Sequence, residues 1–123
     1  GFRVEVYPER KQAHCVLDAS EVHVNRSGVV HGGISATLLD TASGVTASLT
    51  VDDSGLAPFT TVSLNINYIA AARPGLLRAE GRLSGGGRVL TFVEGTLTDS
   101  EGRLIATSTG VFKRLRRRPG ETS

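Results

Sequence analysis

The chain has 123 residues, which suits one domain around one hydrophobic core. No apolar run approaches the ~18 residues that suggest a membrane-spanning helix, so we expect no membrane partner. The net charge of +2 arises from the end of the chain, because residues 113–123 hold five Lys/Arg and one Glu and so carry a net +4. We expect a single domain over residues 1–112 and a basic, disordered tail over residues 113–123.

The first residues predict a β-hairpin. Residues 2–7 alternate apolar and polar side chains, Pro8 begins a charged turn, and residues 13–17 form a second short strand. Cys15 is the only cysteine, which excludes an internal disulfide and is compatible with the cytoplasmic location that we expect. Asp18 then opens an N-cap pattern that predicts one helical turn, ending near Val24.

A long helix is predicted from about Gly33 to Thr50. Its apolar residues recur near helical spacing, and Asp40 is the only charge in residues 34–49. A helix with so few charges is expected to be buried on nearly every side, and a carboxylate in its middle is costly unless it is paired or used. Asp40 is therefore the first candidate for a functional group.

Four longer strands are expected after the helix, over residues 60–70, 76–83, 88–98 and 103–112. Three successive glycines, Gly85–Gly87, predict a tight hairpin between the second and third of them. Hairpin-linked strands pair antiparallel. The predicted fold class is α+β, with one long central helix wrapped by a curved antiparallel sheet of about six strands.

Several kinds of site are not indicated by the sequence. It contains no phosphate-binding loop of the G-x-x-x-x-G-K-[ST] type and no G-x-S-x-G nucleophile motif. The three histidines show no zinc-ligand spacing, so we expect no metal and no cofactor. The basic tail could bind nucleic acid, but no aromatic residue interleaves with its charges, so we expect no nucleic-acid partner.

The residues around the helix start suggest acyl transfer. Gly32 and Gly33 are expected to present free backbone N–H groups at the positive end of the helix, where an oxyanion can bind. His31 could polarise a carbonyl, and Asp40 could act as general base or nucleophile. Each residue also has a structural alternative: His31 could be a satisfied structural histidine, the glycines could serve close helix packing, and Asp40 could pair with an arginine.

The spacing of these groups predicts a dimer. Gly32 and Asp40 are eight residues apart, or about 12 Å along a helix, whereas a catalytic contact needs about 3 Å. One carbonyl therefore cannot reach both groups of one chain. Two antiparallel copies of the helix would bring the Gly32 end of each near Asp40 of the other, so we expect an obligate homodimer with two sites at its interface.

The pattern Asn25-x-x-Gly28-x-x-His31-Gly32-Gly33, followed by Asp40, resembles the hotdog-fold acyl-CoA thioesterases of the phenylacetate-degradation type. The resemblance covers about residues 18–112. It implies the hotdog fold, a dimer with a continuous sheet that often pairs into a tetramer, and hydrolysis of acyl-coenzyme A thioesters, with coenzyme A as part of the substrate.

The resemblance also implies a role for each residue of the motif. The Gly32 N–H forms the oxyanion hole beside Gly33, with support from His31. Asp40 of the partner chain is base or nucleophile. Asn25 helps to position the attacking water, and Thr61 stands where relatives carry a Ser or Thr that orients that water. Arg88 is a candidate for binding the phosphates of the coenzyme.

Two other functions remain open on the same fold. One is a non-catalytic acyl-CoA or acyl-carrier binding protein, although the intact Asp40 and Thr61 favour catalysis. The other is a hydratase or dehydratase, whose acid/base motif is not found here. The identity of the acyl group stays open among aromatic, medium-chain and hydroxylated groups, because it depends on pocket-lining side chains whose positions the sequence does not fix.

Overall fold

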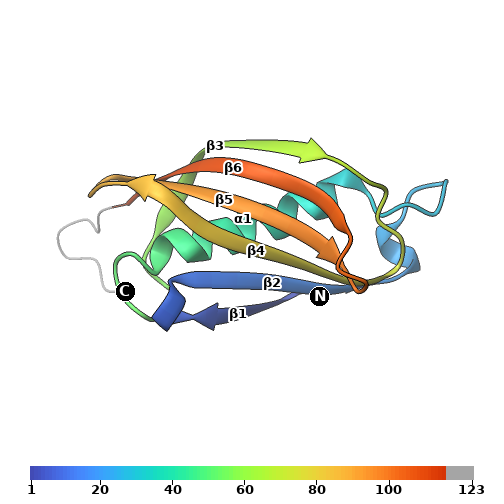
Figure 1. Cartoon of the computed structure of the whole chain (residues 1–123), viewed down its shortest axis with the longest axis horizontal. Helices are drawn as coiled ribbons and strands as arrows, with labels where there is room; N and C mark the ends of the chain where they lie inside the picture. Colours follow the sequence, from blue (N-terminus) through green and yellow to red (C-terminus); the bar gives the residue numbers. More distant parts are fainter. Residues whose placement is uncertain (116–123) are drawn as a thin grey trace.

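The computed structural model describes residues 1–115, which form one α-helix, six strands and two short 3-10 helices (Figure 1). The strands are β1 (Arg3–Tyr7), β2 (Gln12–Ala19), β3 (Phe59–Tyr68), β4 (Gly75–Gly86), β5 (Leu90–Asp99) and β6 (Leu104–Arg114). The helix α1 spans Gly32–Ser48, and the 3-10 helices are η1 (Pro8–Arg10) and η2 (Glu21–His23).

All six strands belong to one antiparallel sheet, in the order β1-β2-β4-β5-β6-β3. Consecutive strands β4, β5 and β6 pair by hairpins, whereas β3 lies at the far edge beside β6. The sheet curves around α1, which lies across its concave face (Figure 1). The predicted α+β fold, with one helix wrapped by a curved six-stranded sheet, is confirmed.

The core lies between α1 and the middle of the sheet. Leu39 and Ala42 of the helix are buried in one cluster with Leu97 of β5 and other apolar side chains of the sheet. Gly81 of β4 permits this close approach, because a Cβ there would lie 2.8 Å from the Ala42 carbonyl and would collide with Thr46. Burial of these apolar surfaces is the main stabilising term of such a fold.

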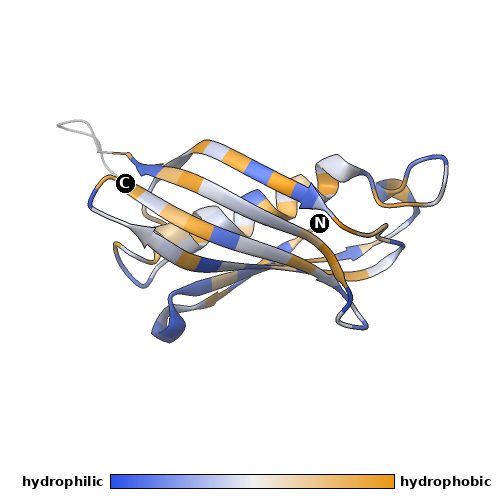
Figure 2. Cartoon of the chain, turned by 45° about the horizontal axis from the view of Figure 1, so that its top comes forward, coloured by the Kyte–Doolittle hydropathy of each residue, from blue (hydrophilic) through white to orange (hydrophobic). Residues whose placement is uncertain are grey.

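Strand β3 is an edge strand with a clear alternation of side chains, visible as bands along it in Figure 2. Leu64 and Ile66 are half-buried, whereas Asn65 and Asn67 are exposed. A bulge at Val62 interrupts the pairing with β6, where the register shifts between residues 61 and 63. The bulge matters for the site, because it changes which face of the sheet each residue before it occupies.

Three local predictions differ from the structure. Ser20, not Asp18, caps η2, because its side chain and that of His23 form a reciprocal capping box. The hairpin turn comes later than expected, at residues 87–89, since the first two glycines of the triplet still belong to β4. Strand β6 continues through Arg114, so two residues that we assigned to the tail pair with β3. The rest of the predicted tail lies outside the described residues.

The expectation that α1 is buried on nearly every side is wrong for the single chain. Leu38 and Leu39 are buried against the sheet, but Gly33 and Thr37 on the other face are exposed and Asp40 is half-buried. The low charge of the helix therefore marks a face of small residues that the sheet does not cover. Within residues 1–115, no helix has the length and apolar character needed to cross a bilayer.

Candidate active site

The first turn of α1 is capped by a histidine. Nδ1 of His31 accepts a hydrogen bond from the Gly33 N–H at 3.0 Å, and the His31 carbonyl accepts from the Ile34 N–H at 2.9 Å. The His31 N–H itself donates to the His23 carbonyl at 2.9 Å, which ties the helix start to η2. The expectation of two free N–H groups is therefore wrong for Gly33, because the His31 ring already occupies that donor.

The backbone N–H of Gly32 remains available as a donor, and the ring of Tyr68 lies next to this glycine. No hydrogen bond among residues 1–115 uses the Gly32 N–H, which is one of the donors that a helix start leaves without an intrahelical partner. The Tyr68 hydroxyl donates to the Gly32 carbonyl at 2.8 Å, and the Tyr68 ring is 3.5 Å from where a Cβ of Gly32 would lie. Sequence analysis missed Tyr68, whose only signal was its place at the end of β3.

Asn25 organises the loop that precedes the helix. Its Oδ1 accepts from the N–H groups of Ser27 and Val29 at 2.9 and 3.2 Å, and Gly28 supplies the left-handed backbone (φ 73°) that the tight turn requires. This loop projects beyond the start of α1 (Figure 1). Asn25 also lines a pocket of about 410 Å³, which is walled by Gly32, Tyr68 and mainly small or apolar side chains.

Asp40 lies eight residues after Gly32 on α1, and its side chain is hydrogen-bonded to Thr61. The Thr61 hydroxyl donates to Oδ1 of Asp40 at 2.8 Å. Tyr68 lies seven positions after Thr61, so in a regular strand the two would point to opposite faces. Both contact α1, because the bulge at Val62 returns Thr61 to the helix side. The structure thus brings together a carboxylate and a hydroxyl that the sequence placed on different elements.

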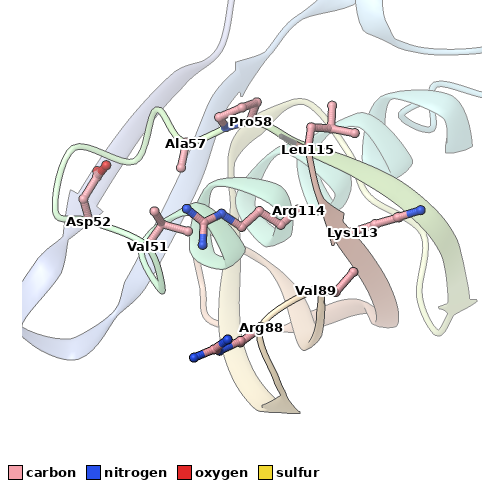
Figure 3. A pocket seen from close by; sticks show the side chains of 9 residues that line it. All are labelled: Val51, Asp52, Ala57, Pro58, Arg88, Val89, Lys113, Arg114 and Leu115. Atoms are coloured by element: carbon pink, nitrogen blue, oxygen red, sulfur yellow. The ribbon is translucent and has the colours of Figure 1, made fainter. Parts of the chain in front are cut away.

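Arg88 lies in the turn between β4 and β5, and no hydrogen bond or salt bridge among residues 1–115 joins it to either group in the same chain. It lines a second pocket, of about 1170 Å³, beyond the end of α1 (Figure 3). Lys113 and Arg114 from the end of β6 border the same pocket, and so does Asp52. Hydrogen bonds from the side chain and backbone of Ser54 hold the pKa of Asp52 below its usual range, with Arg114 adding to the effect.

The predicted residues therefore form two groups within one chain, with Arg88 apart. The first group lies at the start of α1 and comprises Asn25, His31, Gly32 and Gly33. The second group is the Asp40–Thr61 pair, about 12 Å further along the helix by its rise per residue. The first group can bind an anion or developing oxyanion, and the second can supply a base or nucleophile. No group of three or more metal-ligating side chains occurs among the described residues.

The sequence matches the thioesterase superfamily over residues 27–106, a stretch that contains all of these groups except Asn25. The chain belongs to the thioesterase superfamily. It is 35% identical over 94 residues to acyl-coenzyme A thioesterase 13 of Mus musculus, in an alignment that covers 75% of this chain and 65% of the mouse protein. The chain therefore spans a little under two thirds of the length of that relative.

Two solved structures are similar to this chain over most of its length. The phenylacetic acid degradation-related protein of Ralstonia eutropha JMP134 is 30% identical with a TM-score of 0.78, covering 92% of this chain and 83% of its own. A Bacillus halodurans protein solved with CoA is 31% identical with a TM-score of 0.82, covering 94% and 75%. The predicted resemblance to hotdog-fold thioesterases of the phenylacetate type is confirmed.

Proposed function

We propose that this thioesterase-superfamily chain hydrolyses acyl-coenzyme A thioesters to the free acid and coenzyme A, without a metal or further cofactor. The Asp40–Thr61 pair carries the proposal. This half-buried carboxylate accepts from a hydroxyl at 2.8 Å, lies on a helix face otherwise made of small residues, and has no salt-bridge partner among residues 1–115, so it is available as a base or nucleophile. The names of the mouse relative and of the structure solved with CoA support the substrate class.

The reactive centre in this proposal combines two chains. Two copies of α1 packed antiparallel bring the Gly32 end of one near Asp40 of the other, twice, by two-fold symmetry. The open face of α1 and the unpaired edge of β3 support such a dimer. Val62 and Ile69, at and just beyond that edge, are 56% and 55% exposed in the single chain, and a partner that covers the edge would bury them. Pairing of two dimers into a tetramer belongs to the same proposal.

The chemistry follows from the two groups. The Gly32 N–H, at the positive end of the helix dipole, donates to the thioester oxygen as negative charge develops there, and His31 supports the same oxygen. Asp40 of the partner either activates a water that attacks the carbonyl carbon, or attacks it directly to form a mixed anhydride that water then hydrolyses to the free acid and the Asp40 carboxylate. In both cases the C–S bond breaks and coenzyme A leaves as a thiolate. Thr61 orients the carboxylate, while the side-chain amide of Asn25 faces the attacking water.

Arg88 has a place in this arrangement although it is remote from Gly32 of its own chain. In the antiparallel dimer, Gly32 of one chain lies beside Asp40 of the partner. The rest of the partner's α1, from Asp40 to its end at Ser48, extends about 12 Å beyond that point at about 1.5 Å per residue. The pocket bordered by Arg88, Lys113 and Arg114 of the partner then lies on the outer side of the thioester site. Three cations there suit the phosphate-rich end of coenzyme A.

A thiol-release assay with aromatic, medium-chain and hydroxylated acyl-CoA thioesters tests the proposal. We expect turnover of at least one class, and a fall in kcat of about a hundredfold or more in Asp40→Asn, because a catalytic acid or base is lost. Asp53→Asn, which neutralises an exposed carboxylate in the loop after α1, is the matched control and should keep wild-type turnover. Tight acyl-CoA binding by calorimetry without thiol release would instead identify a non-catalytic binding protein.

A further inference from the structure

The peptide bond between Gly32 and Gly33 is held at both ends by side chains. Its carbonyl oxygen accepts from the Tyr68 hydroxyl at 2.8 Å, and its N–H donates to Nδ1 of His31 at 3.0 Å. One side chain comes from the edge strand β3 and the other from the residue before the helix. Among residues 1–115, no other peptide at the start of α1 has a side-chain partner on both its C=O and its N–H.

These contacts form a continuous chain of hydrogen bonds. Donation by the Tyr68 hydroxyl polarises the amide, which makes the Gly33 N–H a stronger donor to His31. A neutral imidazole that accepts at Nδ1 carries its proton on Nε2, so the chain selects one tautomer of His31. The result is a histidine whose free nitrogen is a hydrogen-bond donor, as a developing oxyanion requires.

We propose that Tyr68 is a positioning residue of the active site, which sets the tautomer and the orientation of His31 through the Gly32–Gly33 peptide. This inference rests on the proposed hydrolysis for its effect on rate, but the hydrogen-bond chain exists independently of it. The same chain holds the first helical peptide in one plane and thereby fixes the direction of the adjacent Gly32 N–H.

Stability alone does not account for the position of Tyr68. In the single chain Tyr68 is 56% exposed at the end of an edge strand, so folding of the chain does not leave its hydroxyl as a buried group that needs a partner. Its ring also walls the pocket of about 410 Å³ beside Gly32. The hydroxyl and the ring therefore have separable tasks: the hydroxyl acts through the peptide on the rate, and the ring contacts the acyl or pantetheine part of the substrate.

Tyr68→Phe keeps the ring and removes only the hydroxyl. We expect kcat for acyl-CoA hydrolysis to fall about fivefold to tenfold, the loss that one hydrogen bond of typical strength predicts, with KM within about twofold of wild type. Tyr68→Leu removes the ring as well and should also raise KM. Tyr7→Phe is the matched control, because the only other tyrosine donates to Glu5 on β1, and it should leave both constants unchanged.

NMR spectroscopy provides a readout that does not need turnover. In Tyr68→Phe, we expect the Gly33 amide proton to move upfield and the ¹⁵N shifts of His31 to report a larger share of the Nδ1-protonated tautomer, with neither change in Tyr7→Phe. If wild-type protein hydrolyses acyl-CoA and Tyr68→Phe keeps its kcat, the proposed role of Tyr68 is overturned. If wild-type protein hydrolyses no acyl-CoA, the proposed function fails. Unchanged Gly33 and His31 resonances in Tyr68→Phe would overturn the hydrogen-bond chain, whatever the activity of the wild-type protein.

Discussion

Replacing Thr61 with valine removes one hydroxyl from the proposed active site and little else. Valine has nearly the same shape, is β-branched and is equally suited to a strand, so the fold should keep its stability within about 0.5 kcal/mol. The change deletes the 2.8 Å hydrogen bond to Oδ1 of Asp40. Asp40 then loses the one side-chain hydrogen bond that its carboxylate makes within the described part of the chain.

The size of the effect follows from the kind of hydrogen bond. A hydroxyl that donates to a carboxylate is charge-assisted and is typically worth about 1.5–3 kcal/mol. Thr61 is exposed in the single chain, so we take the lower end of that range. At about 1.4 kcal/mol for each factor of ten, kcat should fall about tenfold.

The assay is thiol release from the best acyl-CoA substrate, with the urea unfolding midpoint measured in parallel. Thr61→Ser keeps the hydroxyl and should retain kcat near that of wild type. Thr60→Val makes the same change one residue earlier on β3, at an exposed threonine, and should have no effect. A Thr61→Val enzyme with wild-type kcat, or an equal loss in Thr60→Val, would refute the claim that Thr61 orients the catalytic carboxylate.

Two further predictions concern stability. Gly81→Ala should destabilise the fold by about 3 kcal/mol, the upper range for overpacking, because the new methyl group would collide with the Ala42 carbonyl and with Thr46. Thr46 cannot move aside, since its hydroxyl donates to that carbonyl and accepts from the Ala13 N–H. Urea titration measures the loss of stability, and an unchanged midpoint would contradict the packing described for α1. Burial lowers the pKa of His14, so the folded protein resists protonation of this side chain and its stability should fall as the pH drops below the ordinary 6.5 of histidine. His14→Gln should flatten this dependence in urea midpoints, and an equally steep loss in the variant would assign it to other groups.

The fold and the helix start could be predicted because their signals are local. The hairpin at the N-terminus, the long helix and the four later strands each follow from periodicity and turn residues that lie next to one another in the chain. His31, Gly32 and Asp40 could be singled out for the same reason, since all three belong to one short segment with an unusual lack of charge.

The contacts across the fold could not be predicted in this way. Strand alternation put Thr61 and Tyr68 on opposite faces, and only the bulge at Val62 places both against α1. The capture of the Gly33 N–H by His31 depends on the backbone angles of the cap, which residue types do not specify. The exposure of one face of α1 escaped prediction because a lack of charge is equally typical of a helix buried by its own chain and of one covered by another copy.

Subunit mixing tests the central claim, that each active site combines the helix start of one chain with Asp40 of another. Asp40→Asn removes the carboxylate. Gly32→Pro removes the N–H of the first helical residue, a position where proline is well tolerated, and the extended backbone of His31 (φ −59°, ψ 136°) accommodates a following proline. Each variant should be inactive alone.

When the two variants are mixed and their subunits exchange, each heterodimer should contain one intact site and one doubly altered site. Random exchange of equal amounts makes half of the dimers heterodimers, so we expect thiol release to recover to about a quarter of the wild-type rate. Native mass spectrometry of the mixture reports the heterodimer directly. Recovery in proportion to the heterodimer is the result that our account predicts, and a mixture that contains heterodimer but releases no thiol would contradict it.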